Sequence, residues 1–232
     1  KFSSIVALSN KIDNLMGLFS MGMIPTGSRD PFALRRAAAG IVKICMEHKL
    51  NIDFVNLIAN TQKEYNNLDV SKMMEFFNER LFKIFNDVNP SVIKAVLASG
   101  ESDILKITQK IDALNPIVNS KDFSNFSATF KRVANIIKDI DTNATLSVDV
   151  SLFEDTEEGD LFEAYNGVVS KEYDNYEEEL DALFGLKSTL DNFFDNVFVN
   201  HENEAIKTNR KNLIGLVYQA FKNIADIKEI TI

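Results

Sequence analysis

Apolar side chains recur every three or four residues along almost all of this 232-residue chain, the spacing that places them on one face of an α-helix. The pattern predicts successive helices with these inward-facing residues: Ile5, Leu8, Ile12, Leu15 and Phe19; Leu34, Ala38, Ile41, Cys45 and His48; Met74, Phe77, Leu81, Ile84 and Val88; Ile104, Ile107, Ile111 and Leu114; Phe126, Phe130, Val133, Ile137 and Ile140; Val169, Tyr173, Tyr176, Leu180 and Leu183. A short helix closed by Gly100 and a final pair over about 186–199 and 204–225 complete the set. The expected fold class is all-α, a helical bundle.

Capping and breaking signals set the predicted helix boundaries. Asp30 can accept hydrogen bonds from the free amides of a first helical turn, and Pro31 suits the first helical position because its nitrogen carries no hydrogen. Asn89-Pro90 and Asn115-Pro116 are expected to stop the helices that precede them.

One stretch departs from the helical spacing. In TLSVDVSLF, residues 145–153, apolar and polar residues alternate with the period of a β-strand. No second segment shares this period, and a single strand leaves its backbone groups unpaired. The stretch is therefore predicted to be an extended linker.

The charge of the chain is unevenly distributed. The formal net charge is −9, but residues 154–181 hold twelve carboxylates against Lys171 alone, a net charge of −11. The rest of the chain is therefore mildly basic, at +2. A basic remainder permits contact with RNA without requiring it.

Cationic side chains are grouped on three predicted helices. The group near the loop PTGSRDPFALRR contains Arg29, Arg35 and Arg36. A second group consists of Lys131, Arg132 and Lys138, and a third of Lys207, Arg210 and Lys211, which stand at i, i+3 and i+4 on one helix. Such groups can neutralise phosphates, although each of them is also compatible with an ordinary solvated surface.

No self-contained active site is visible in the sequence. The chain has no phosphate-binding glycine loop, its two histidines lack neighbouring cysteine pairs, and no serine–histidine–acid spacing stands out. We therefore expect no catalytic residue and no metal ligand. Cys45 and His48 are predicted to pack inside. No apolar run reaches membrane-spanning length and no signal peptide is visible, so the chain is expected in a reducing cytoplasm, as a piece of a longer protein.

The run PTGSRDPFALRRAA resembles the glycyl-tRNA synthetase β subunit of the tetrameric bacterial type. The likeness extends over the whole chain through LSNKIDNLMGLF, FFNERL, VIKAVLASG and FKRVANI. LFEDTEEGDLFEAYN and FFDNVFVNHENEAIKTNRKNLI are similar to the anticodon-binding module that arginyl-tRNA synthetases share. The resemblance implies three parts: the last helices of an HD-like domain at 1–50, connecting helices at 51–118 and a DALR-like anticodon-binding domain at 119–232.

This resemblance also implies a function and partners. The family forms an α2β2 assembly in which the α subunit makes glycyl-adenylate from glycine and ATP, with Mg, while the β subunit grips tRNA-Gly. The chain is then the C-terminal end of the β subunit, with no cofactor of its own and no membrane or DNA partner. Where related HD-like domains carry an aspartate this chain has Asn10, so no functional metal is expected, and Asp13 is expected to be a surface carboxylate.

Candidate roles follow for the cationic side chains. Arg132, Lys207, Arg210 and Lys211 are the candidates for the anticodon end of the tRNA, and Lys131 is a further candidate for tRNA binding. Arg29, Arg35 and Arg36 either serve the tRNA body or clamp a domain junction, and the pair Arg35 and Arg36 can instead bind carboxylates of the acidic helix. A different class of function remains open, a helical protein-interaction module that docks a partner subunit without RNA contact. An arginyl-type synthetase module is disfavoured because that family lacks the DPFALRR run.

Overall fold

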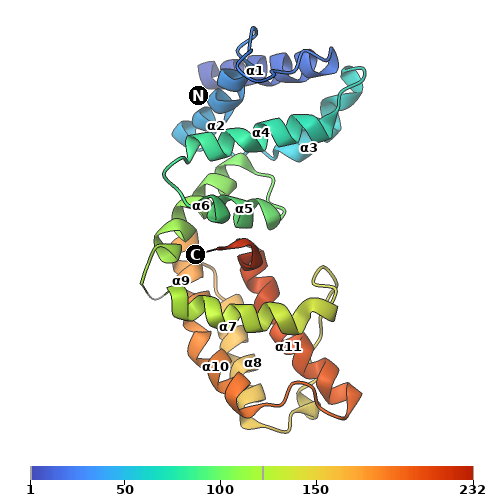
Figure 1. Ribbon diagram of the computed structural model, residues 1–232, viewed down its shortest axis with the longest axis vertical. Coiled ribbons are helices and arrows are strands. Elements are labelled where there is room, and N and C mark those ends of the chain that lie inside the picture. The colour runs from blue at the N-terminus through green and yellow to red at the C-terminus, as the bar shows by residue number, and fades with distance from the viewer. Residues whose placement is uncertain (1, 122, 232) are drawn as a thin grey trace. The chain divides into compact units, whose positions relative to one another are not determined.

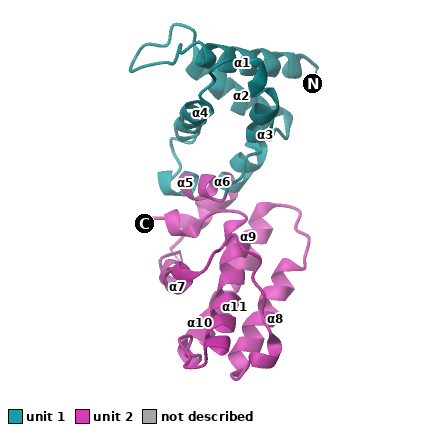
Figure 2. Cartoon of the chain, turned by 90° about the vertical axis from the view of Figure 1, so that its right-hand side faces the viewer, with its two compact units in different colours: residues 1–93, 100–111 teal, residues 94–99, 112–232 magenta. Residues whose placement is uncertain are grey.

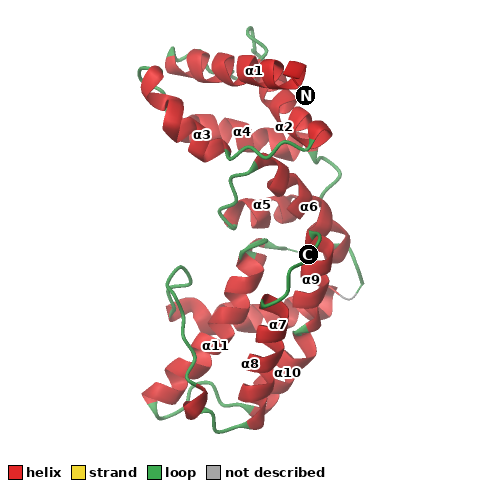
Figure 3. Cartoon of the chain, turned by 180° about the vertical axis from the view of Figure 1, so that it is seen from behind, coloured by secondary structure: helices red, strands yellow, loops and turns green. Residues whose placement is uncertain are grey.

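The computed structural model describes residues 2–121 and 123–231, and within them the regular elements are helices, with no strand (Figure 3). The expected all-α class is confirmed. The chain divides into two compact units, residues 1–93 with 100–111 and residues 94–99 with 112–232 (Figure 2). The division into 1–50, 51–118 and 119–232 stays a prediction. Among the described residues, none of the helices combines the length and apolar character that crossing a bilayer demands.

The first unit is built on a stack of amphipathic helices (Figure 1). It contains α1 (Phe2–Ser20), α2 (Leu34–His48), α3 (Phe54–Thr61), the 3₁₀ turn η1 (Gln62–Glu64) and α4 (Val70–Ile84). Helix α2 packs against both α1 and α4. Their buried faces include Leu8, Leu15, Phe19, Leu34, Ala38, Ile41, Cys45, Phe77 and Leu81. Most predicted inward residues of these helices are confirmed, but Ile5 and His48 are exposed.

Helix α2 begins three residues later than predicted. Pro31 lies in a turn, and Ala33 adopts a left-handed conformation with φ 57° just before the first helical residue. The Asp30 carboxylate nevertheless accepts hydrogen bonds from the amides of Leu34 and Arg35, at 2.8 and 3.0 Å. The capping role predicted for Asp30 is confirmed, and the position predicted for Pro31 is wrong, because Asp30 reaches the helix across an intervening turn.

The two Asn-Pro signals act differently from the prediction. Helix α4 ends at Ile84, before Asn89, and Pro90 is the first residue of α5 (Pro90–Ala98). Pro116 does not stop α6 (Ile104–Val118) but lies inside its last turn. A proline there costs a single backbone hydrogen bond, and the Asn119 amide still donates to the Asn115 carbonyl. The final turn therefore survives.

The second unit is a bundle of helices (Figure 1), and its core includes a cluster of phenylalanine rings. Its elements are α7 (Phe123–Ile136), η2 (Ile137–Asp139), η3 (Val150–Leu152), α8 (Thr156–Val169), α9 (Tyr176–Gly185), α10 (Lys187–Asn196), α11 (Glu204–Lys222) and η4 (Ile227–Glu229). The rings of Phe126, Phe130, Phe184 and Phe221 lie 4.0–5.8 Å apart between centroids. Helix α7 turns Phe126, Phe130 and Val133 inward and Lys131 outward, as predicted, and Lys138 is also exposed but lies in η2.

The acidic segment forms two helices rather than one. Helix α8 ends at Val169, which is exposed, and α9 begins at Tyr176. The Asn175 side chain accepts a hydrogen bond from the Glu178 amide and so starts a new helix. The single inward face predicted across 169–183 is therefore wrong, although Leu180 and Leu183 are buried.

The predicted linker lies along α11 and is bound to it through its own backbone. The Asn209 side chain exchanges two hydrogen bonds with the main chain of Asp149, and Asn212 donates to the Ser147 carbonyl. Gln219 donates to the carbonyls of Thr142 and Ala144. Side-chain amides of the helix thus replace the partner strand that the alternating pattern lacks. We call residues 142–149 the strap.

Candidate nucleic-acid interface

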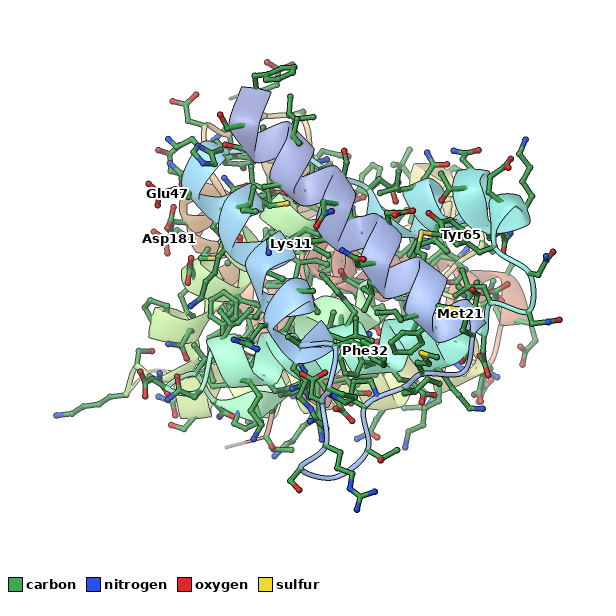
Figure 4. The ribbon with its side chains drawn as sticks, turned by 90° about the horizontal axis from the view of Figure 1, so that it is seen from above. Lys11, Met21, Phe32, Glu47, Tyr65 and Asp181 are labelled. Carbon is green, nitrogen blue, oxygen red and sulfur yellow. The ribbon has the colours of Figure 1, made fainter. Side chains whose placement is uncertain are left out.

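The predicted cations of the first unit lie at the loop between α1 and α2. Arg35 is half-buried and donates a 2.7 Å hydrogen bond to the Gly27 carbonyl, so it holds the loop in shape. Arg29 and Arg36 are exposed, and no described residue pairs with either guanidinium. Met21 and Phe32, at the two ends of this loop, are also exposed (Figure 4). The loop and the first turn of α2 therefore display two guanidinium groups that have no partner among the described residues.

Helix α7 carries the second group of cations. Lys131 is exposed and has no carboxylate partner among the described residues. The Arg132 guanidinium lies 4.5 Å from the centroid of the Phe194 ring and donates to the Phe194 carbonyl at the end of α10. An ion pair with Asp195 is long, at 3.8 Å, and 53% of the Arg132 side chain stays exposed. Arg132 is thus oriented by the protein while remaining accessible.

The third group, on α11, is divided between surface and core. Lys207 pairs with Glu204 at 3.0 Å, and Lys211 lies 3.5 Å from Asp139. Arg210 stands between them in the sequence, but only 2% of its side chain is exposed. The spacing of Lys207, Arg210 and Lys211 predicts that all three lie on the surface. In this structure Arg210 is buried and does not face a phosphate.

Three carboxylates and one carbonyl surround the buried guanidinium. Arg210 Nε and Nη2 each lie 3.0 Å from an oxygen of Glu158, which is fully buried. Nη2 also lies 2.9 Å from Asp155 and 3.4 Å from Glu154, while Nη1 donates to the Phe198 carbonyl at 2.9 Å. We call these residues the Arg210 cluster. It ties the start of α8 and the loop after α10 to α11.

The electrostatics of the cluster favour its charged form. Burial opposes the charge of Glu158, but hydrogen bonds from Arg210 and from the amides of Asp155 and Glu154 outweigh it, so the pKa of this carboxyl lies below its ordinary value. Glu158 also completes a capping box with Asp155 at the start of α8. The same carboxylate therefore caps one helix and holds a second.

A signal for the burial of Arg210 exists in the sequence. Ile206, Arg210, Leu213 and Val217 follow one another at steps of four, three and four, and all four are buried. The triad of cations at 207, 210 and 211 was the more conspicuous pattern, although Arg210 belongs to the apolar stripe. Sequence reasoning also missed Phe198, whose side chain is exposed in the loop between two buried valines.

The histidines and acids show no metal-binding arrangement in the part of the chain that the structure describes, where no three of the usual ligands gather. His201 Nδ1 accepts a hydrogen bond from the Asn203 amide, and its Nε2 lies 3.4 Å from Glu154. His48 is exposed, so its predicted packing is wrong. Asp13 is exposed, as expected of a surface carboxylate, and accepts a 2.6 Å hydrogen bond from the Tyr65 hydroxyl.

Comparison with known proteins gives a consistent likeness. A family described as glycyl-tRNA synthetase beta subunit matches residues 1–98. The glycine–tRNA ligase beta subunit of Helicobacter pylori strain G27 is 41% identical over 238 residues, covering 100% of this chain and 34% of the relative. Those of Geotalea daltonii and Janthinobacterium sp. are 34% and 33% identical, covering 98% and 97% of the chain and 35% and 34% of the relatives. The chain spans about a third of the length of the curated relatives it matches.

Proposed function

Because the chain belongs to the glycyl-tRNA synthetase β subunit family, we propose that it is the part of a glycine–tRNA ligase β subunit that holds tRNA-Gly. In this role it supports the ATP-dependent attachment of glycine. The resemblance assigns the chain to the C-terminal end of the β subunit and to an α2β2 assembly in the cytoplasm. Both assignments belong to the proposal, as does the use of ATP and Mg by the α subunit.

The observation that carries the proposal is the accessible pair Lys131 and Arg132 on α7. Lys131 has no carboxylate partner among the described residues and is free to contact a phosphate. Arg132 already stacks on Phe194, and its second face is available to an unstacked base, since bases stack on guanidinium planes. A phosphate contact beside a stacking plane is what recognition of a single-stranded anticodon loop requires.

The remaining candidate cations are proposed to have different roles. Lys207 and Lys211 lie on α11, with their charges partly offset by Glu204 and Asp139. Arg29 and Arg36 are proposed to contact the tRNA body, because both guanidinium groups are exposed and unpaired within the described residues. Arg35 and Arg210 contribute by holding a loop and a helix junction.

The proposal is tested by tRNA-Gly binding to the complete α2β2 enzyme at several salt concentrations. Removing one phosphate-facing cation lowers the slope of log affinity against log salt by about 1, and removing a stacking guanidinium weakens binding further without changing the slope. We expect both effects for Lys131→Ala/Arg132→Ala. The matched control is Lys121→Ala/Lys171→Ala, which removes the same charge from exposed positions of the same unit. Equal slopes in the two variants contradict the proposed interface.

A second candidate function rests on a groove in the first unit. Phe2, Ile5 and Val6 of α1 are exposed, and Ile5 borders a groove of about 590 Å³ that Leu8 and Ile52 also line. Apolar residues in such a position favour docking of a partner subunit. Gel filtration with the α subunit, with and without tRNA-Gly, separates the two candidates. Co-elution with protein alone supports the docking module.

A further inference from the structure

The loop that joins α10 to α11 can be followed in Figure 1, and it carries an exposed aromatic side chain. Phe198 is 68% exposed, while its neighbours Val197 and Val199 are buried. The two valines anchor the loop in the core and turn the residue between them outward. Exposing so large an apolar side chain forgoes the gain from burying it. The exposed ring is therefore a candidate binding surface for a ligand.

The backbone that carries Phe198 is held in place on both sides. The Phe198 carbonyl accepts the 2.9 Å hydrogen bond from the buried Arg210 guanidinium, and the Val197 amide donates to the Phe193 carbonyl. Beyond it, the Asn203 amide donates to His201. A ring on a fixed backbone loses little conformational freedom when it binds. Arg210 thus positions a surface ring from inside the unit.

The charges around this loop are only partly matched within the protein. Arg210 carries one positive charge against the three carboxylates of Glu154, Asp155 and Glu158, and Glu204 pairs with Lys207. Asp195 faces Arg132, whose guanidinium donates to the Phe194 carbonyl four residues before Phe198. Of the carboxylates in residues 195–204, only Glu202 has no cationic partner among the described residues. The excess negative charge beside the ring disfavours a phosphate contact there, so a ligand at Phe198 would be bound through the face of the ring.

We propose that Phe198 stacks on an unpaired base of the bound tRNA and that Arg210 is the positioning residue that sets the ring in place. This inference rests on the proposed function and adds a specific contact to it. Base–aromatic stacking suits an exposed phenylalanine because every base has a π-face, and the contact needs no phosphate. An RNA is favoured over a protein partner because Arg132, a second stacking plane, is displayed at the end of the helix that leads into the loop.

The test compares side chains at position 198 in the complete α2β2 enzyme with tRNA-Gly as the probe. Phe198→Trp keeps an aromatic face and should retain wild-type affinity. Phe198→Leu keeps an apolar side chain without a π-face, and with Phe198→Ala it should weaken binding by roughly five- to 150-fold, the range for loss of one stacked base. The salt slope should stay unchanged, since no phosphate contact is lost. Val150→Ala, at another exposed apolar residue of the same unit, is the matched control.

Arg210 is tested by Arg210→Lys, which keeps the positive charge but lacks the fork that reaches both Glu158 and the Phe198 carbonyl. We expect weaker tRNA binding with an unchanged salt slope, and no further loss when it is combined with Phe198→Ala. A purely structural role predicts that the two losses add.

The outcomes separate this inference from the function on which it rests. If Phe198→Leu binds tRNA-Gly like wild type, an apolar side chain without a π-face suffices at position 198 and the stacking proposal is overturned. If the wild-type enzyme binds tRNA and Phe198→Ala is unaffected, the inference fails while the proposed function stands. If the wild-type enzyme shows no salt-dependent binding of tRNA-Gly, both fail.

Discussion

Replacing Arg210 by methionine removes the charge at the centre of the Arg210 cluster and keeps most of the side-chain volume. Glu158 then remains fully buried without its cation, although the amides of Glu154 and Asp155 still donate to it. Breaking a buried ion pair by removing one partner costs about 3–5 kcal/mol. The two remaining amide bonds keep the expected cost near the lower end, at about 3 kcal/mol.

The size of this effect is judged against a surface pair of the same unit. Arg132→Met removes an exposed pair whose charges are 3.8 Å apart, and it should cost at most about 1 kcal/mol. The double variant Arg210→Met/Glu158→Leu removes both buried charges. Its loss of unfolding free energy should be at least about 1 kcal/mol smaller than the sum of the losses in Arg210→Met and Glu158→Leu.

The assay is hydrogen exchange of peptides from α8 and α11 at increasing urea concentration. It reports the free energy of opening for the second unit separately from the first, which global unfolding would not do. The reasoning is refuted if Arg210→Met lowers that free energy no more than Arg132→Met, or if the Arg210 and Glu158 effects simply add.

Four further predictions concern the titration of Glu158, two helical glycines and the reactivity of one thiol. The lowered pKa of Glu158 means that its contribution to stability is complete above about pH 4.5 and is lost as the pH falls further, so the opening free energy of α8 should decline more steeply in acid for wild type than for Glu158→Gln. A Cβ at Gly215 would lie 2.5 Å from Leu146 Cδ1, and because this methyl group ends a flexible side chain and Ala favours the helix, Gly215→Ala should destabilise the second unit by at most about 1 kcal/mol in urea unfolding. In α8, Gly167 has no atom near the added methyl group, and Gly167→Ala should stabilise it by about 0.4–1 kcal/mol. Burial, with a smaller effect of Asp103, raises the pKa of Cys45 to about 11, so its thiol should react with a disulfide reagent at neutral pH only after unfolding, and labelling in the native state at the rate of a free thiol would contradict this.

The helical class and most inward faces could be predicted because they depend on spacing within one helix. Phe126, Phe130 and Val133 are buried and Lys131 is exposed, as the pattern indicates. His48 departs from the pattern because it lies in the last turn of α2, where the helix leaves the core. The ends of helices are where a periodic pattern says least.

The candidate site depends on contacts between distant residues, and the sequence shows these poorly. Arg210 and Lys211 are adjacent in the sequence, yet one is enclosed by Glu158, 52 residues away, and the other is not. The sequence shows the acidic block at 154–181 but does not single out Glu158, its most deeply buried carboxylate. Only the fold decides which carboxylate meets which guanidinium.

The hydrogen bonds between the strap and α11 constrain the number of residues in the strap. Its attachments through Asn209, Asn212 and Gln219 grip main-chain groups at 142, 144, 147 and 149. Many side chains are acceptable at these four positions, because the hydrogen bonds use backbone carbonyls and amides that are present whichever residue occupies them. Insertion or deletion of one residue there would instead shift every downstream group out of register with the helix. This segment is tolerant of composition and intolerant of length.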